Sequence, residues 1–397
     1  MTPSPSPDKV TPNISPRRLL FYRILLSLFS VVLMLGMLEL GMWVLGINPP
    51  QRDDGTRPHP IWHHWHPKNY RLDYYVKAEG YTKPVTFNEH GLRESRSISV
   101  AKPPGVFRIA VLGDSFVEAM QVEEDETLVR QLEKNLQPVI RQKMKQRLEV
   151  LNFGCRGFCT SLEMLLLREF VLKFEPDMVI LVHFFNDISD DSQFGVWAHY
   201  QGKKLVAVRK PGAGKGRDVR EFFRRSRLVR LVSGALHERR RARQSRLQPK
   251  ESLLVGWDAI VHDPYTPDDE KAWKHSLGYL GQIADMLRQR RIPFLVAVIP
   301  IPTQVEPVSA QFAAESGALW LAGGKRLEYT GYQRKLTAYC RSKGIAYLDL
   351  LPAFRAANPS GRTWLFLPKD GHWTAAGHAL AARKITEYLQ AGKGLKP

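Results

Sequence analysis

The chain has 397 residues, and its 58 Lys and Arg residues outnumber its 39 Asp and Glu residues by 19. An excess of this size suggests a polyanionic partner, a membrane surface or a solvated basic segment. Hydrophobic residues make up 44% of the chain and charged residues 24%, which excludes a protein that is disordered throughout. Three cysteines exclude a disulfide-built scaffold and disfavour a multi-cysteine metal site.

The N-terminus combines a polar leader with a long apolar run. Residues 1–18 are rich in Pro, Ser, Lys and Arg and are predicted to be a disordered cytoplasmic leader. Residues 24–47 contain one charge, Glu39, and a helix of this length exceeds the roughly 30 Å thickness of a bilayer core. We therefore predict a transmembrane signal-anchor over residues 19–47; a cleaved signal peptide is less favoured because the run lacks the alanines of a cleavage site.

Charge around the apolar run predicts its orientation. Four basic residues precede it, namely Lys9, Arg17, Arg18 and Arg23. Two basic residues and two acids follow it and balance one another, namely Arg52, Asp53, Asp54 and Arg57. The positive-inside rule then places the N-terminus in the cytoplasm and the rest of this single-pass chain on the periplasmic, extracytoplasmic side.

Two features near the anchor have more than one interpretation. Glu39 could be a functional intramembrane acid, a helix–helix contact or a residue near the far interface. The segment 59–66 holds four histidines and two tryptophans, whose irregular spacing is a weak metal signal. We expect an interfacial, Trp-rich stretch just outside the bilayer instead.

Beyond residue 100, apolar runs alternate with amphipathic stretches, which indicates βαβ units on a parallel sheet. The predicted strands are 106–112, 148–153, 178–183, 293–299 and 346–350. The predicted helices are 126–146, 161–174, 268–290, 325–343 and 374–390, the last with Thr374 as its N-cap.

A basic block interrupts this alternation. Residues 201–250 contain 17 Lys and Arg against three acids, a net charge of +14, so the rest of the chain carries only about +5. Seven apolar residues recur there at near-helical spacing: Phe222, Phe223, Leu228, Val229, Leu231, Val232 and Leu236. We predict a basic amphipathic helical insertion over 201–260 that contacts anionic lipid, an acidic glycan or only water. Nucleic acid is disfavoured because the predicted topology puts this block outside the cytoplasm.

Polar residues stand where the predicted strands end, which is where ligands bind in such sheets. Ser115 follows Gly113 and Asp114 after the first strand, a glycine-bearing loop around Gly157 follows the second, and Asn186 follows the third. An Asp370-Gly-His372 sequence precedes the last helix. A serine hydroxyl needs an adjacent base, whose tautomer a carboxylate holds, so these residues predict nucleophilic catalysis.

These four elements, in this order, resemble the SGNH (GDSL-type) hydrolase family over residues 83–390. Residues 88–93 and 122–127 are also similar to its membrane-anchored members. The resemblance implies an α/β, flavodoxin-like three-layer fold with Ser115 as nucleophile, His372 as base and Asp370 as the residue that orients it. The N–H groups of Ser115 and Gly157 and the Asn186 amide would form the oxyanion hole; no metal or cofactor is implied.

The sequence departs from the family pattern in two places. The family more often has Asp-x-x-His, whereas Asp370 and His372 are two residues apart, as in alginate-type O-acetyltransferases. In the element that follows the third predicted strand, Phe185 stands where the family often has glycine. Asn186, which supplies the side-chain amide, is still present.

Several residues have competing roles. Ser115 and Asp114 could simply cap a helix, and His378 is a rival base. Asp349 is a rival orienting acid, although the end of a strand is its expected place, and Asp187 is expected to hold its loop. Cys155 and Cys159 could pair in an oxidising compartment, leaving Cys340 alone, or remain buried free thiols.

The predicted organisation is a leader (1–18), an anchor (19–47), a lead-in segment (48–100), a split catalytic domain (101–200 and 261–397) and the insertion (201–260). The predicted function is an esterase that works through an acyl-Ser115 intermediate, on an acyl-ester substrate such as an O-acylated glycan or lipid. The alternatives are an O-acetyltransferase of an exported glycan with the same residues, and a catalytically idle envelope scaffold.

Overall fold

The computed structural model describes residues 15–47, 55–209, 226–233, 236, 264–306, 330–359 and 364–392. The chain forms two compact units. One contains residues 1–52 and 216–248, and the other contains residues 53–215 and 249–397.

The first unit contains helix α1, Pro16–Val44. Within the described part of the chain it is the one helix long and apolar enough to cross a membrane, and its most apolar stretch is not buried in the protein. Its composition fits the predicted anchor, while the orientation stays a prediction. Residues 227–233 and 236 of this unit are also helical.

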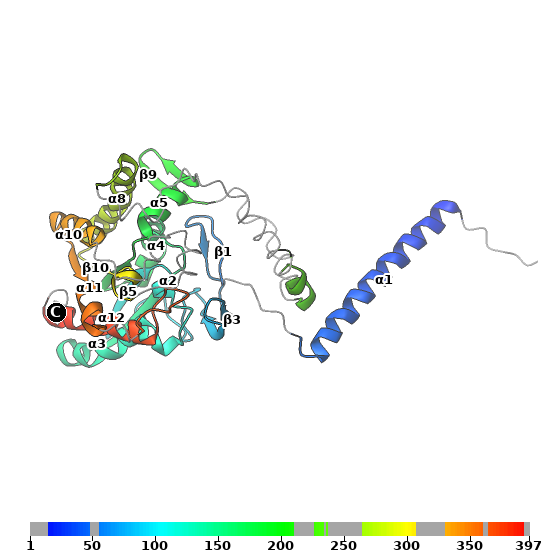
Figure 1. Ribbon diagram of the computed structural model, residues 1–397, viewed down its shortest axis with the longest axis horizontal. Helices are drawn as coiled ribbons and strands as arrows, with labels where there is room; N and C mark the ends of the chain where they lie inside the picture. The colour runs from blue at the N-terminus through cyan, green and yellow to red at the C-terminus, as the bar shows by residue number, and fades with distance from the viewer. Residues whose placement is uncertain are drawn as a thin grey trace, which may run out of the picture. The chain divides into compact units, whose positions relative to one another are not determined.

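The second unit is built on a parallel sheet of five strands (Figure 1). The strands are β5 (Val106–Gly113), β6 (Arg147–Gly154), β7 (Met178–His183), β10 (Phe294–Val298) and β11 (Ala346–Asp349). Their spatial order, β11-β10-β7-β5-β6, is the flavodoxin-like order in which the first strand lies between the second and the third. The predicted fold class is therefore confirmed.

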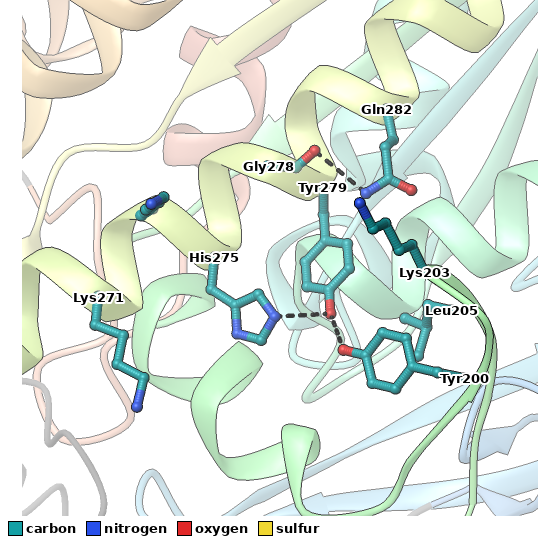
Figure 2. Close-up of a pocket in the computed structure, with 9 residues that line it drawn as sticks. Tyr200, Lys203, Leu205, Lys271, His275, Gly278, Tyr279 and Gln282 are labelled. Carbon is teal, nitrogen blue, oxygen red and sulfur yellow. Dashed lines mark hydrogen bonds between the residues drawn. The ribbon is translucent and has the colours of Figure 1, made fainter.

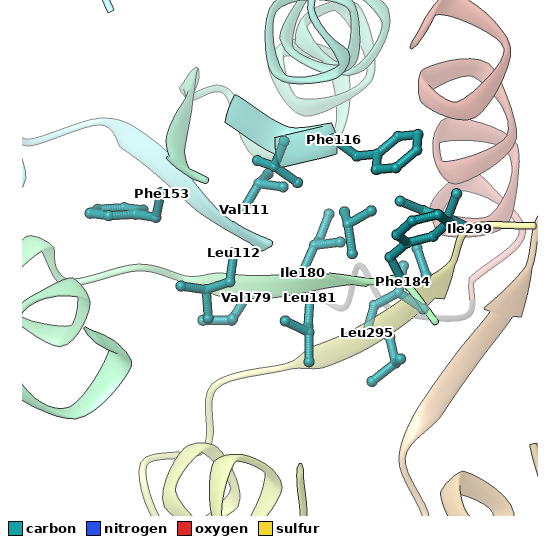
Figure 3. Close-up of a cluster of buried hydrophobic side chains, with 14 of the residues drawn as sticks. Val111, Leu112, Phe116, Phe153, Val179, Ile180, Leu181, Phe184, Leu295 and Ile299 are labelled. Carbon is teal, nitrogen blue, oxygen red and sulfur yellow. The ribbon is translucent and has the colours of Figure 1, made fainter. Parts of the chain in front are cut away.

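Helices cover both faces of this sheet (Figures 1 and 3). They are α2 (Ser115–Glu118), α3 (Leu128–Met144), α4 (Thr160–Glu169), α5 (Asp187–Gly195), α8 (Pro267–Gln289), α10 (Gly331–Lys343), α11 (Leu351–Ala357) and α12 (Ala375–Gln390). Single 3-10 turns lie at Glu124–Glu126, Val171–Phe174 and Pro302–Gln304. Helix α3 packs against α12, and α8 packs against α4 and α5.

The strands carry apolar side chains on both faces, as parallel strands between two helical layers must. Figure 3 shows the neighbouring residues Ile180 and Leu181 of β7 on opposite sides of the sheet. Both are completely buried. This double burial explains why the strands are continuous apolar runs in the sequence, and all five predicted strands are confirmed within two residues.

The helix predictions are confirmed with adjusted boundaries. Thr374 caps α12 by accepting a hydrogen bond from the Gly377 N–H at 3.3 Å. Helix α8 begins earlier than predicted because Thr266 and Asp269 form a capping box around Pro267. The predicted helix 161–174 is divided into α4 and a 3-10 turn, and residues 325–329 lie outside the described residues.

Three antiparallel hairpins lie outside the predicted pattern. They are β1 (Arg57–Pro58) with β2 (His64–Trp65), β3 (Tyr70–Val76) with β4 (Tyr81–Phe87), and β8 (Ala198–Gln201) with β9 (Lys204–Val208). The last hairpin occupies the start of the predicted basic insertion, and Phe222 and Phe223 lie outside the described residues.

The prediction of an interfacial tryptophan stretch is wrong. Trp62 and Trp65 are 6% and 7% exposed and belong to the hydrophobic core of the second unit. Trp62 stacks on Phe170, with ring centroids 5.9 Å apart. The aromatic rings gain more from burial against this cluster than an interface would offer, so the segment closes over the α/β unit.

Candidate active site

Ser115 is held at the end of β5 by a tight strand-to-helix connection. Asp114 caps α2 by accepting a hydrogen bond from the Phe116 N–H at 2.9 Å. Any side chain on Gly113 would collide with Val117, and one on Gly154 would collide with the backbone of α2. The two glycines therefore let α2 lie directly on the strand ends, with Ser115 partly exposed at its first residue.

Asp370 and His372 lie in a turn before α12. Gly371 between them has φ 81°, a left-handed conformation that favours glycine. The His372 carbonyl accepts from the Leu367 N–H at 2.7 Å, and the Gly371 N–H donates to the Leu367 carbonyl at 2.8 Å, which closes the turn. This conformation brings two side chains that are two positions apart in sequence toward each other.

The structure joins Ser115, His372 and Asp370 in one chain of hydrogen bonds. His372 Nε2 lies 2.7 Å from Ser115 Oγ, so the hydroxyl can donate to the imidazole. His372 Nδ1 lies 2.5 Å from Asp370 Oδ1, with the ring N–H donating to the carboxylate. The order of contacts is that of a nucleophile, a base and a group that fixes the tautomer of the base.

The two ionisable members of this chain shift each other's pKa. Burial lowers the pKa of His372, but the Asp370 charge and its hydrogen bond outweigh burial, so the pKa lies above the ordinary value of 6.5. Burial raises the pKa of Asp370, and the interaction with His372 reverses this and holds it below its usual 3.8. Asp370 is therefore an anion at neutral pH, ready to stabilise an imidazolium.

Asp370 also has partners that the sequence analysis missed. Glu79, in the β3–β4 turn, accepts from the backbone N–H groups of Lys369 and Asp370 at 2.7 and 3.1 Å. Gln121 Nε2 donates to Asp370 Oδ1 at 3.3 Å, and the Gln121 carbonyl accepts from the Tyr81 hydroxyl at 2.9 Å. The β3–β4 hairpin thus contributes to the position of Asp370. No local motif in the sequence indicates this role.

Gly157 and Asn186, the expected oxyanion donors, follow β6 and β7. Gly157 has φ 67° in an open turn, and no hydrogen bond from its N–H is seen within the described part of the chain. Asn186 Nδ2 donates to Asp190 Oδ2 at 2.8 Å, which leaves its second N–H for another acceptor. Both residues lie beside β5, at the point where the strand order reverses, and their role in catalysis stays a proposal.

The rival residues have other roles. His378 Nδ1 accepts from the Leu128 N–H at 3.2 Å, and burial lowers its pKa to about 3, so it is a neutral packed histidine. Asp349 Oδ1 accepts from the Leu351 N–H at 2.9 Å at the start of α11. Asp187 is buried, 3.4 Å from His183 Nδ1. Cys155, Cys159 and Cys340 are buried free thiols.

A buried ionic cluster lies at the end of α2, the helix that begins with Ser115. Glu118, the last residue of α2, is completely buried and contacts His66 Nε2 at 2.8 Å and Arg156 Nε at 3.1 Å. Burial would raise the pKa of Glu118, but Arg156 and His66 outweigh it and lower the pKa to about 2. Arg93 donates to the carbonyls of Glu118, Ala119 and Val122, at the end of α2 and just beyond it. Residues from the lead-in segment therefore fix the helix that carries Ser115.

A basic cavity of about 380 Å³ lies between α8 and the β8–β9 hairpin (Figure 2). Figure 2 shows His275, Tyr279 and Tyr200 joined by hydrogen bonds, with O–O and N–O distances of 2.9 and 3.3 Å. Lys203 and Lys271 also line the cavity, together with Lys274. None of these lysines forms an ion pair with a described residue, and the cavity places their positive charge beside two aromatic rings.

Nothing in the described ranges points to a metal centre. Within residues 55–209, 264–306 and the other described segments, no group of three or more His, Cys, Asp or Glu side chains is arranged to hold an ion. The four histidines of the segment 59–66 instead take part in hydrogen bonds and ring contacts, such as His64 Nε2 with the Arg156 carbonyl at 2.7 Å.

Comparison with known proteins gives one family match. Residues 261–396 match the family described as the SGNH hydrolase-like domain of acetyltransferase AlgX. This part of the chain includes Asp370 and His372, and the match confirms the SGNH resemblance predicted from the sequence. No curated protein matches the chain at the level of sequence.

Several solved structures are similar at low identity. An acetyl xylan esterase, AlAXEase, is 13% identical over 71% of this chain and 100% of its own, with a TM-score of 0.38. A two-domain esterase active on acetylated mannans is 12% identical over 72% of this chain and 50% of its own, with a TM-score of 0.39. A catalytic mutant of Axe2, an acetylxylan esterase from Geobacillus stearothermophilus, is 12% identical over 71% and 93%, with a TM-score of 0.38. At such TM-scores, substrate and mechanism rest on this chain's own residues.

Proposed function

We propose that this SGNH hydrolase-like protein is an esterase that cleaves acyl esters through an acyl-Ser115 intermediate. The observation that carries the proposal is the continuous hydrogen-bonded path from Ser115 Oγ through His372 to Asp370, at 2.7 and 2.5 Å. A packed loop histidine would not need both contacts at once.

The path supports a two-step reaction. As Ser115 Oγ attacks the ester carbonyl, its proton passes to His372 Nε2, and Asp370 stabilises the resulting imidazolium. The carbonyl oxygen becomes an oxyanion, which the N–H groups of Ser115 and Gly157 and the Asn186 amide would bind; the first N–H groups of a helix have no partner within the helix. His372 then protonates the leaving alkoxide, and the acyl group remains on Ser115. In the second step His372 takes a proton from the acceptor as the acceptor attacks the acyl carbonyl. The bond between the acyl group and Ser115 Oγ then breaks, and His372 returns the proton to Ser115.

With water as the acceptor the protein is a hydrolase, and with a sugar hydroxyl it is an O-acetyltransferase. The family match, which is to a domain of an acetyltransferase, favours transfer as the second candidate. The lysine and tyrosine side chains of the basic cavity have the chemistry to hold an acidic sugar, because ammonium groups pair with carboxylates and aromatic rings stack on sugar faces.

The experiment is an acetyl-ester assay with and without a glycan acceptor. We expect release of acetate from the ester in water, and transfer would appear as acetylated glycan formed at the expense of acetate. Hydrolysis with no acetylated glycan at any acceptor concentration would contradict the transferase. A complete lack of ester cleavage with both acceptors would contradict both candidates.

We further propose that α1 is an uncleaved membrane anchor that leaves the catalytic unit on the extracytoplasmic side. The length and composition of α1 and the basic residues before it support this arrangement. A protein anchored in this way would meet esters of exported glycans or of lipids at the membrane surface.

A further inference from the structure

Glu39 is the only charged residue between Ile24 and Ile47, yet its carboxylate is fully used. It accepts hydrogen bonds from Ser226 Oγ at 2.8 Å, from the Arg227 N–H at 2.6 Å and from the Leu228 N–H at 3.0 Å. These donors stand at the start of the helical residues 227–233. The acid of α1 therefore caps the beginning of a second helix within the same unit.

A second contact runs in the opposite direction. Arg227 Nη1 donates to the Met42 carbonyl at 3.1 Å and to the Ile47 carbonyl at 3.3 Å. Carbonyls at the end of a helix lack partners within the helix, and a cation there is also favoured by the helix dipole. Glu39 of α1 thus caps the start of the second helix, and Arg227 of that helix binds carbonyls near the end of α1 and just beyond it.

The position of Glu39 places this junction at one membrane surface. Glu39 precedes the end of α1 at Val44 by five residues, which is about 8 Å along a helix. A carboxylate at this depth is costly without partners, and three hydrogen bonds provide them. A helix that starts there begins at the boundary between lipid tails and headgroups.

Among the described residues, the apolar side of this second helix is largely exposed. Leu228, Val232 and Leu236 recur every four residues and so share one face. Leu231, Val232 and Leu236 are 50%, 50% and 52% exposed. The adjoining surface of α1 is equally uncovered and would face lipid. Arg230 lies on the side away from Val232, where headgroups and water would be.

We propose that the helical residues 227–233 and 236 form an interfacial helix, docked on the outer end of α1 through Glu39, whose apolar face enters the acyl region of the bilayer. This inference rests on the proposed anchoring of α1. In this proposal the apolar face of the helix in the basic insertion contacts lipid. Glu39, the acid within the membrane segment, binds the start of that helix. The chain would then contact the membrane through two segments, α1 and the interfacial helix.

The test places a single environment-sensitive fluorophore, NBD, on a cysteine in the full-length protein in phosphatidylcholine vesicles that contain a doxyl-labelled lipid. The positions are Val232→Cys, Leu35→Cys in the middle of α1, and Ser233→Cys as a control on the same helix. The native cysteines are buried, so labelling is confined to the new site.

We expect the probe at Val232 to shift to the blue and to lose most of its fluorescence to the doxyl lipid, as the probe at Leu35 does, while the probe at Ser233 is quenched less. Adding Glu39→Gln should weaken quenching at Val232, because one amide oxygen cannot replace two carboxylate oxygens. Ser30→Ala, which removes the hydroxyl that donates to the Leu26 carbonyl on α1, should leave it unchanged.

The outcomes separate the two proposals. Quenching at Leu35 without quenching at Val232 would overturn the interfacial helix and leave the anchor intact. Quenching at neither position would contradict the membrane anchor itself, and the interfacial helix with it. Equal quenching at Val232 with and without Glu39→Gln would overturn the docking through Glu39.

Discussion

Gly371 decides whether Asp370 and His372 can act together. With a side chain at this position the left-handed φ of 81° would be strained, and the turn that brings the two functional groups to 2.5 Å would be lost. In the commoner Asp-x-x-His spacing one more residue separates the two side chains. The structure shows that one glycine conformation compensates for the missing residue.

The raised pKa of His372 predicts the acidic limb of the pH–rate profile. Below its pKa the imidazole is protonated and cannot accept the Ser115 proton, so kcat/KM should rise with pH through a value above 6.5. Asp370→Asn removes the charge that raises this pKa, so the limb should move to lower pH while the rate falls by about 10³–10⁴-fold. A profile measured for both proteins checks this, and an unshifted limb in the variant would contradict the pairing.

Asn186 is predicted to act on rate and not on folding. Replacing one oxyanion donor lowers kcat by about 10²–10³-fold in comparable sites, and we expect Asn186→Ala to do the same. Its bond to Asp190 is local, within one turn, so thermal unfolding should change little. Steady-state kinetics and a melting curve are the measurements; a variant with normal kcat would remove Asn186 from the proposed oxyanion hole.

At the scale of elements, the lead-in segment and α2 depend on each other. Glu118→Ala would leave the buried His66 and the partly exposed Arg156 without the carboxylate that both contact, and loss of one partner of a buried cluster costs about 3–5 kcal/mol. Urea unfolding at pH 7 should show this loss. Glu123→Gln, which removes the partly exposed pair with Lys83, is the control and should cost less than about 1 kcal/mol.

The same cluster has a defined pH dependence. The pKa of Glu118 is lowered to about 2, so its contribution is present above the ordinary pKa of 4.5 and is lost as the pH falls toward 2. The stability gap between the wild type and Glu118→Ala should therefore narrow in acid. A gap that stays constant down to pH 3 would mean that the carboxylate charge is not what holds the cluster.

Elements differed in how far the sequence could predict them. Strands β5, β7 and β10 are continuous apolar runs because both of their faces are buried, and such runs are recognisable locally. Hairpin β3–β4 was missed because only Leu72 and Val76 of β3 are buried, and polar or exposed residues, including the charged Asp73, separate them.

Contacts distant in sequence were also beyond prediction. Glu79 and Gln121 contact Asp370, although they lie nearly 300 and 250 positions from it in the sequence. The residues around Glu79 and Gln121 in the sequence do not indicate this contact. The position of Ser115 after a strand could be predicted from local sequence, and the structure brings His372 and Asp370 to it, while the catalytic roles of the three stay proposals. Trp62 and Trp65 were misplaced because proximity to an anchor in sequence does not reveal what a ring packs against.

The net charge of the whole molecule, +19, is concentrated in one segment, because residues 201–250 carry +14 of it. The proposed topology puts this block on the extracytoplasmic side, and a reporter enzyme that is active only in the periplasm, fused after Pro397, tests it. We expect an active fusion, because the basic residues before α1 favour a cytoplasmic N-terminus. An inactive but intact fusion would contradict the orientation.

The central claim, that Ser115 forms the covalent intermediate, is tested most directly with a serine-directed fluorophosphonate probe followed by mass spectrometry. The wild-type protein should carry one adduct on the peptide that contains Ser115, Ser115→Ala should carry none, and His372→Ala should react far more slowly while melting at nearly the wild-type temperature. Labelling that persists unchanged in Ser115→Ala, or a wild-type protein that never reacts, would contradict this account.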